Sequence, residues 1–180
     1  LNNFGQLGIG LGYGNDRSSP VQIPGTSWSA ISAGSGFSLA TKTDNTLWAW
    51  GVNSFGQLGQ NDATSYSSPR QIPGTTWSSV SAGYQHTTAT KTDGTLWAWG
   101  VNSLGQLGQN DRITRSSPRQ IPGNTWSSVS CYRNSFATKT DGTLWGWGNG
   151  SYGQLGQNDR ITRSSPVQIP GTTWSSISGS

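Results

Sequence analysis

The sequence predicts an all-β protein made of one repeated unit that is stacked on copies of itself. The repeat is visible in the tryptophans, because Trp28, Trp77, Trp126 and Trp174 lie 49, 49 and 48 residues apart. Short segments rich in Thr, Val, Ile and Trp alternate with Gly, Pro, Asn and Asp, and the apolar residues show no helical period of 3.6. A unit repeated at this interval buries its apolar faces against its neighbours.

The elements of one complete unit can be assigned in chain order. The unit begins with the Gly-rich segment 53–59 and a polar loop, and we expect strands at 68–73, 77–83, 86–92 and 96–100. Asp-Gly pairs between the last two of these strands, such as Asp93 and Gly94, fit a tight hairpin turn because Gly tolerates positive φ.

The last strand of the unit indicates how the units pack. In Leu-Trp-Ala-Trp-Gly, at 96–100, the two Trp side chains share one face of the strand and the smaller residues share the other. A sheet placed between two neighbouring sheets needs bulky rings on one side and small residues on the other. A sandwich would instead show polar residues on one face. Four strands per unit with this packing predict a β-propeller blade.

Three motifs give the unit a family resemblance. They are Phe55-Gly-Gln-Leu-Gly59, Ala82-Gly-Tyr-Gln-His-Thr87 and Asp93-Gly-Thr-Leu-Trp-Ala-Trp-Gly100. Together they resemble the regulator-of-chromosome-condensation repeat, and the resemblance recurs in register along essentially the whole chain. It implies a propeller with seven blades, which would need roughly 340 residues at this repeat length.

The 180 residues therefore correspond to about half a ring. We expect one propeller segment, 1–180, with repeats at approximately 1–50, 51–99, 100–147 and 148–180, of which the first and last are incomplete. Half a ring leaves unpaired apolar blade faces. Residues beyond this sequence complete the ring, or a second chain does so through a closing head-to-tail contact. We favour the first alternative.

Composition argues against several classes of function. Charged residues make up only 10% of the chain, the formal net charge is +4, and there is a single Cys and a single His. These counts do not support a disulfide framework, a His- or Cys-based metal site or a Ser-His-Asp arrangement. We expect no catalysis, no cofactor and no metal. No run of 18 apolar residues occurs, so we also expect no insertion into a membrane.

Positions that differ between the repeats indicate surfaces that are released from packing. One such set lies in the loop between the second and third strands of the unit, where equivalent loops ring one end of a propeller. The candidate ligand-binding residues there are Phe37, Tyr84, Gln85, His86, Tyr132, Arg133 and Asn134. The aromatic rings offer stacking area, and the polar side chains offer hydrogen bonds. For His86, a role in blade packing is the alternative.

The second variable set lies in and around the long polar loop. It contains a candidate basic arc on adjacent blades, formed by Arg112, Arg115, Arg119, Arg160 and Arg163. Such an arc is typical of nucleic-acid binding, in which affinity falls steeply with salt. We favour the interpretation that the arc is solvated and has no partner. Nucleic acid is therefore a possible partner but not the favoured one.

These observations lead to two hypotheses of different classes. The first is a non-catalytic recognition or structural propeller that binds protein or glycan through one rim. Its near-identical repeats and uncharged polar surface resemble bacterial, phage or other viral surface proteins, which favours an extracellular, cell-surface or virion location. The alternative, implied by the family resemblance, is guanine-nucleotide exchange on a small GTPase together with chromatin binding.

Overall fold

The computed structural model describes residues 1–12 and 14–178, and this part of the chain contains strands and no helix. The strands are β1 (Trp28–Ala33), β2 (Phe37–Lys42), β3 (Leu47–Gly51), β4 (Tyr66–Ile72), β5 (Trp77–Ala82), β6 (His86–Lys91), β7 (Leu96–Gly100), β8 (Arg115–Ile121), β9 (Trp126–Cys131), β10 (Asn134–Lys139), β11 (Leu144–Gly148) and β12 (Arg163–Ile169). They form three antiparallel four-stranded sheets with neighbouring strands in chain order. We call these sheets blade 1 (β1–β4), blade 2 (β5–β8) and blade 3 (β9–β12).

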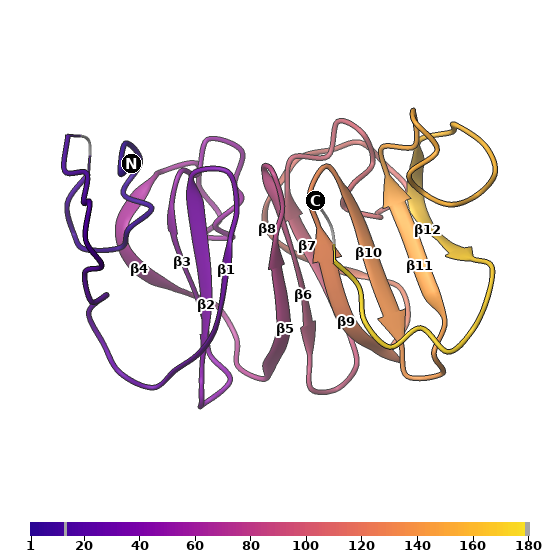
Figure 1. Ribbon diagram of the computed structural model, residues 1–180, viewed down its shortest axis with the longest axis horizontal. Helices are drawn as coiled ribbons and strands as arrows, with labels where there is room; N and C mark the ends of the chain where they lie inside the picture. The colour runs from indigo at the N-terminus through magenta and orange to yellow at the C-terminus, as the bar shows by residue number, and fades with distance from the viewer. Residues whose placement is uncertain (13, 179–180) are drawn as a thin grey trace.

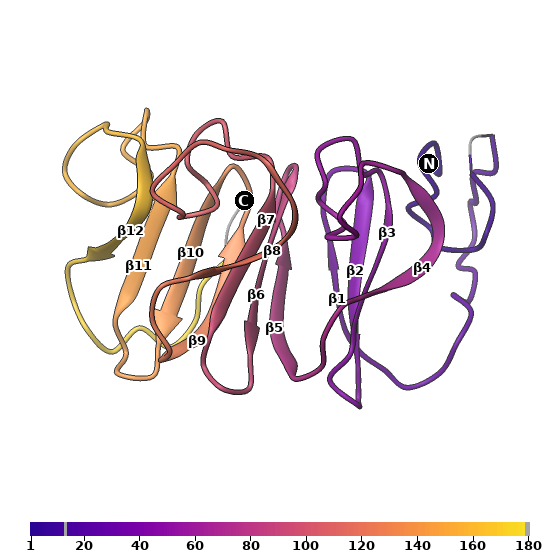
Figure 2. The ribbon, with the colours of Figure 1, turned by 180° about the vertical axis from the view of Figure 1, so that it is seen from behind.

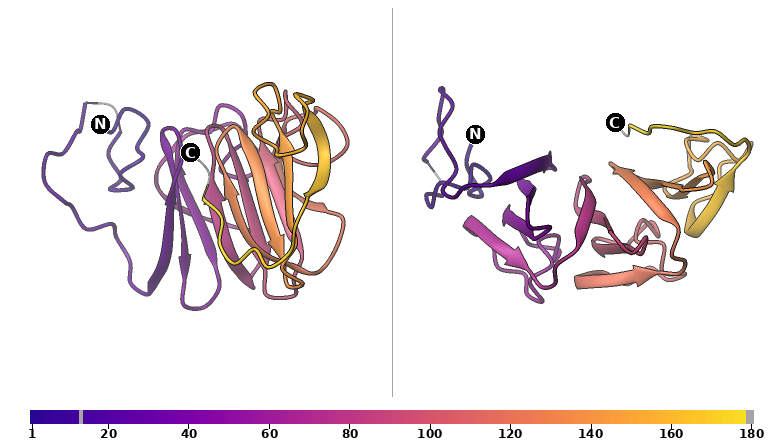
Figure 3. Two further views of the ribbon diagram at one scale, coloured as in Figure 1. Left: turned by 45° about the vertical axis from the view of Figure 1, so that its right-hand side comes forward. Right: turned by 90° about the horizontal axis from the view of Figure 1, so that it is seen from below.

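The three blades stand side by side and follow an arc (Figures 1 and 3). Seen from behind, they keep the same order along the molecule (Figure 2). The first strand of a blade contacts the first two strands of the blade before it: β5 contacts β1 and β2, and β9 contacts β5 and β6. The predicted all-β architecture of four-stranded propeller blades is therefore confirmed, and the described blades follow an open arc (Figure 3).

The blades are out of phase with the predicted sequence repeats. Each blade takes its first three strands from one repeat and its fourth strand from the next, as blade 1 takes β4 from the repeat at 51–99. The first and last repeats, 1–50 and 148–180, also contain residues 13, 179 and 180, which lie outside the described part. Because each blade combines strands of two repeats, hydrogen bonds between its third and fourth strands join consecutive repeats.

Apolar cores lie between the blades. Leu39, Leu58 and Ile72 of blade 1 and its loop pack with Trp77 and Trp99 of blade 2. The same arrangement recurs one blade later. There, Leu107 and Ile121 pack with Trp126, Val129 and Trp147. Each strand of the Leu-Trp-x-Trp-Gly type buries its second Trp completely and its first only partly, so the two rings have different roles.

A backbone carbonyl of the Gly-Gln-Leu-Gly loop joins each blade to the next. The carbonyl oxygen of Gln57, in the loop after β3, accepts hydrogen bonds from Trp99 Nε1 at 3.0 Å and from Thr87 Oγ1 at 2.8 Å, both in blade 2. Gln106 O accepts equivalent bonds from Trp147 Nε1 at 2.9 Å and Ser135 Oγ at 2.8 Å in blade 3. We call this arrangement the carbonyl clamp.

The clamp also forms at the N-terminal end of the described chain. There Gln6 O accepts bonds from Trp50 Nε1 at 2.9 Å and from Ser38 Oγ at 3.0 Å, both in blade 1. The three copies differ only in the hydroxyl donor, which is Ser, Thr and Ser in turn. The repeated Gln, Trp and hydroxyl residues of the sequence therefore meet at one junction in every blade.

The loop motif holds its own shape so that it presents this carbonyl. Asn53 is buried: its Oδ1 accepts a bond from Leu58 N at 2.9 Å, while its Nδ2 donates to Asp62 Oδ1 at 2.9 Å. Gly59 has φ +69° and lies so close to the clamp that a Cβ there would be 2.8 Å from Trp99 Nε1. The Gly of this motif is thus required by the close approach of the Trp ring as well as by its backbone conformation.

Blade 1 presents an uncovered apolar face at the start of the arc. Ile31 of β1 is 68% exposed, whereas Val129, its counterpart in β9, is buried between blades. A cavity of about 380 Å³ lies on this face and is lined by Val21, Ile31 and Trp50 among others. Ile31 is thus exposed at a position that the preceding blade covers in blade 3.

The carbonyl clamp predicts the effect of removing a single hydroxyl. Thr87→Val keeps the shape of the side chain but deletes a donor to Gln57 O, so we expect the free energy of unfolding to fall by about 1 kcal/mol in urea titrations. The matched control is Thr88→Val, in the same buried strand, whose hydroxyl contacts only Cys131 Sγ at 3.5 Å. Equal losses in the two variants would contradict the clamp.

Candidate functional site

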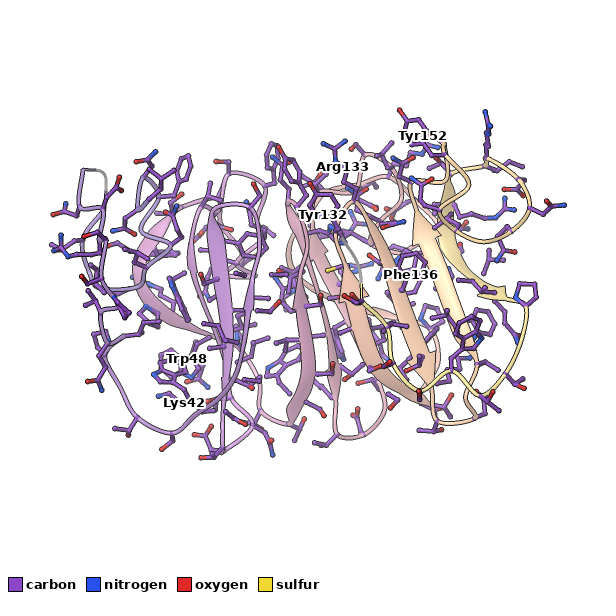
Figure 4. The ribbon with its side chains drawn as sticks, in the orientation of Figure 1. Lys42, Trp48, Tyr132, Arg133, Phe136 and Tyr152 are labelled. Atoms are coloured by element: carbon purple, nitrogen blue, oxygen red, sulfur yellow. The ribbon has the colours of Figure 1, made fainter. Side chains whose placement is uncertain are left out.

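Two aromatic side chains and an arginine come together at the upper end of blades 2 and 3. The rings of Tyr84 and Tyr132 meet edge to face with centroids 6.0 Å apart. The guanidinium of Arg133 lies 5.3 Å from the Tyr84 ring centroid and 6.0 Å from that of Tyr132. Figure 4 shows Tyr132 and Arg133 at this end of the molecule. We call Tyr84, Gln85, Tyr132 and Arg133 the upper rim.

The upper rim borders a hollow of about 290 Å³. Besides the rim, the hollow is lined by the buried His86 and by the loop after β7, through residues that include Val101, Ser103 and Leu104. The backbone fixes the two turns of the rim to each other, because Tyr84 N donates to Tyr132 O at 2.8 Å. The rim is therefore a surface preorganised by two adjacent blades, with both tyrosines about 40% exposed: 39% for Tyr84 and 40% for Tyr132.

The other three predicted ligand-binding residues are buried. Phe37, His86 and Asn134 are the first residues of β2, β6 and β10, and their exposed fractions are 1%, 1% and 8%. They occupy the same position of the unit, directly before the hydroxyl donor of the carbonyl clamp. They are thus not part of the exposed rim surface, although His86 also lines the hollow beside it. The sequence signal that distinguishes the two groups is position: these three residues begin a strand, whereas Tyr84 and Tyr132 lie in the turn before it.

His86 links two blades through a short hydrogen-bond chain. Its Nε2 lies 2.8 Å from Ser135 Oγ, which itself donates to Gln106 O. Because the serine proton is used in that second bond, His86 Nε2 donates to Ser135. Burial lowers the pKa of His86 from 6.5 to about 3, so the ring is neutral at ordinary pH.

The structure divides the candidate basic arc into paired and exposed arginines. Arg115 Nη2 lies 2.7 Å from Asp111 Oδ2, and Arg163 Nη2 lies 2.6 Å from Asp159 Oδ2, four residues earlier in each loop. The other members, Arg112, Arg119 and Arg160, are exposed. Two of the five predicted charges are thus compensated locally, which reduces the positive field that nucleic acid would meet.

The lower end of every blade carries a cluster that sequence reasoning missed. In blade 2, Lys91 Nζ lies 4.8 Å from the Trp77 ring centroid and 4.5 Å from that of Trp97. Lys139 stands in the same way over Trp126 and Trp145 of blade 3, at 4.7 and 4.4 Å. The equivalent Lys42 lies over Trp28 and Trp48 in blade 1, and Figure 4 shows Lys42 and Trp48 at the lower end. We call each group a Lys–Trp cage.

The hairpin turn orients the outer Trp of each cage. Asp93 Oδ1 accepts bonds from Thr95 N at 3.0 Å and from Thr95 Oγ1 at 2.7 Å, and Thr95 Oγ1 accepts a bond from Trp97 Nε1 at 2.9 Å. The Thr95 hydroxyl, followed by its backbone N–H, holds the pKa of Asp93 below its usual value. Asp44 and Asp141 repeat this arrangement in the other blades. The repeated aspartates thus fix rings and turns.

The single cysteine is buried by packing. Cys131 is buried, at 5% exposed, with its thiol directed to Ser81 O at 3.2 Å. Burial raises the pKa of this thiol. Within residues 1–12 and 14–178, no three His, Cys or Asp side chains gather as a metal site would require. A helix able to cross a membrane is likewise absent from that part.

Comparison with known proteins agrees with this architecture. A model of the regulator of chromosome condensation (RCC1) repeat matches residues 1–41, 44–90, 93–134 and 141–179. The chain belongs to the RCC1-repeat family. A second RCC1-repeat model matches 28–57 and 77–106, so the resemblance seen in the sequence motifs is confirmed. No curated protein matched the chain.

Three solved structures are similar to this chain in fold. Human WBSCR16 matches with a TM-score of 0.69 and 25% identity over 79% of this chain and 39% of its own. Prp20p from Saccharomyces cerevisiae matches with a TM-score of 0.68 and 21% identity over 81% of this chain and 39% of its own. Yeast RCC1 (Prp20) bound to Kap60 gives 0.73 and 19%, over 88% and 41%. The chain thus spans about two fifths of each of these proteins.

Burial of the only His predicts a pH dependence of stability. Because its folded pKa of about 3 lies below the unfolded value of 6.5, unfolding takes up a proton as the pH falls through this window. We expect a loss of about 2 to 3 kcal/mol between pH 6.5 and pH 4.5. The carboxylates with lowered pKa, such as Asp93, titrate below 3.8 and contribute little there.

The variant His86→Asn provides the control, since Asn134 occupies the same position in blade 3. Urea titrations at pH 6.5 and pH 4.5 should show that the loss is largely absent in this variant. A variant that keeps the full acid sensitivity of the wild type would contradict the neutral, buried state of His86.

Proposed function

We propose that this RCC1-repeat chain is a non-catalytic recognition propeller that binds a protein partner through the upper rim. The observation that carries the proposal is the joining of Tyr84, Tyr132 and Arg133 across two blades beside a hollow of about 290 Å³. Aromatic and arginine side chains are the residue types that most often dominate the energy of protein interfaces. The rigid turns reduce the entropy that such a site loses on binding.

Relatives of the same fold support a protein as the partner. The structure of Prp20p was described together with its binding properties to Gsp1p and histones. Yeast RCC1 (Prp20) was solved bound to Kap60. Both are similar to this chain in fold alone, so they favour the class of partner and leave its identity to experiment.

The alternative of guanine-nucleotide exchange on a small GTPase makes a separate prediction. An exchange factor would accelerate release of a labelled nucleotide from its GTPase at micromolar protein. Binding at the upper rim without any acceleration would favour recognition alone. Nucleic-acid binding would show affinity that falls steeply with salt, and the compensated charges of Arg115 and Arg163 argue against a strong effect.

The proposal predicts that the two tyrosines dominate binding. Proteins retained by the immobilised chain from an extract of its source would be identified by mass spectrometry, and a purified partner would be titrated by calorimetry. We expect Tyr84→Ala combined with Tyr132→Ala to weaken its Kd by about tenfold or more, because truncating central aromatic residues costs about 2 kcal/mol or more.

The matched control is Tyr152→Ala. Tyr152 is 88% exposed and lies at the same end of the molecule, away from the paired tyrosines (Figure 4). This variant should bind like the wild type. Unchanged binding in the Tyr84 and Tyr132 double variant would exclude the upper rim as the docking site.

A further inference from the structure

We propose that the lower ends of blades 2 and 3 carry two equivalent carbohydrate sites, which together bind a neutral, linear glycan. The first site is built around the Lys–Trp cage of Lys91 and the second around that of Lys139. Both lie at the opposite end of the molecule from the upper rim, as the equivalent Lys42 and Trp48 show in Figure 4. The proposal is independent of the protein-binding function proposed above.

The two sites are hollows of closely similar size and lining. One has a volume of about 380 Å³ and is walled by Trp97, Pro73 and Pro118. The other, of about 420 Å³, is walled by the corresponding Trp145, Pro122 and Pro166. Such volumes suit a small ligand, and an apolar wall with a few placed polar groups is typical of ligand sites. Rings of Pro and Trp suit the apolar face of a sugar.

Each hollow offers one unused donor and one unused acceptor. Lys91 Nζ is held over two rings, and none of the described carboxylates forms an ion pair with it. The side-chain nitrogen of Gln60 donates a hydrogen bond to Gln71 O at 3.2 Å, which leaves Oε1 of the same amide as the acceptor. In the second site, Gln109 donates its amide nitrogen to Gln120 O, also at 3.2 Å. Sugar hydroxyl groups match this combination because each both donates and accepts.

The charge of the sites favours a neutral ligand. Lys91 is the only charged side chain that lines the first hollow, and Lys139 the only one that lines the second. The Asp93 carboxylate lies close enough for Lys91 to contribute to lowering its pKa, and Asp141 stands in the same relation to Lys139. Each ammonium also lies over the faces of two Trp rings, which balance part of its charge inside the cage and favour a neutral ligand over an anion.

Both sites are rigid before any ligand binds. The hydroxyl groups of Thr95 and Thr143 hold the indole nitrogens of Trp97 and Trp145 at 2.9 and 3.0 Å, so the outer ring of each cage is fixed. A linear glycan whose units reached both hollows would gain a second contact without a second loss of translational freedom. Linked contacts of this kind raise affinity by about 10² to 10⁴.

Blade 1 supplies a natural comparison within the same chain. It has the full Lys–Trp cage, but Ile9 stands at the position of Gln60 and Gly10 at that of Asn61. The backbone follows the same path, because Gly10 N donates to Ser67 O just as Asn61 N donates to Ser116 O. Isoleucine is therefore compatible with the fold at this position, while it removes the acceptor.

The experiment uses an array of neutral linear oligosaccharides of several lengths, with acidic polyuronates for comparison. The best neutral binder is then titrated by calorimetry. The Gln60→Ile and Gln109→Ile double variant should bind it about tenfold more weakly, since each site loses one hydrogen bond. Oligosaccharides long enough to span both sites should bind at least tenfold more tightly than fragments of half that length.

The matched control is Gln157→Ile. Gln157 makes the same amide bond, to Gln168 O at 3.0 Å, in the last repeat, where the described residues include no lysine that would complete a cage. This variant and the Tyr84→Ala, Tyr132→Ala double variant should bind the glycan within about twofold of the wild type. Circular dichroism and thermal unfolding would verify that all variants are folded.

Several outcomes would overturn the proposal. They are the absence of binding to every neutral oligosaccharide, binding confined to polyuronates and abolished by salt, and wild-type affinity in the double glutamine variant. Loss of glycan binding on changing Tyr84 and Tyr132 would also overturn it, because the ligand would then occupy the upper rim. Glycan binding at the lower end would accord with the extracellular, cell-surface or virion location that the sequence favours.

Discussion

The carbonyl clamp is the interaction on which the rest of this structure depends. A single peptide oxygen, that of Gln57 or Gln106, accepts one bond from a buried indole and one from a buried hydroxyl of the next blade. Leaving such a group unpaired away from water costs more than the bond itself contributes. Blades 1 and 2 therefore each need the following blade to satisfy a carbonyl of their own loop. Apolar packing of the Trp rings stabilises the same junctions.

The upper rim and the Lys–Trp cages both depend on the carbonyl clamp. The clamp sets the separation of adjacent blades, and the His86 and Ser135 chain beneath the rim sets their alignment. Tyr84 and Tyr132 can meet because their turns are brought together by these buried contacts. At the other end, the partly buried first Trp of each Leu-Trp-x-Trp-Gly strand remains available for the Lys–Trp cage, because the second Trp alone serves the clamp.

Sequence reasoning predicted the fold because its signals are local and repeated. Strand alternation, Asp-Gly turns and the paired Trp positions can each be recognised within a few consecutive residues. It did not separate Tyr84 from His86, since variation between repeats was interpreted as freedom from packing. In fact Phe37, His86 and Asn134 differ from one another while all are buried. The cages were missed for another reason: Lys91, Trp77 and Trp97 come from three strands, so only the fold brings them together.

Hydrogen exchange of the indole N–H groups, followed by NMR after selective ¹⁵N labelling of tryptophan, tests the central claim most directly. The clamp predicts that the Nε1–H of Trp99 and Trp147 exchange as slowly as the most protected strand amides, since they are released only when blades separate. The Nε1–H of Trp97 and Trp145, bonded only to a threonine in their own turn, should exchange much faster. Equally fast exchange of both sets would contradict the account, because the blades would then be held by apolar contact alone.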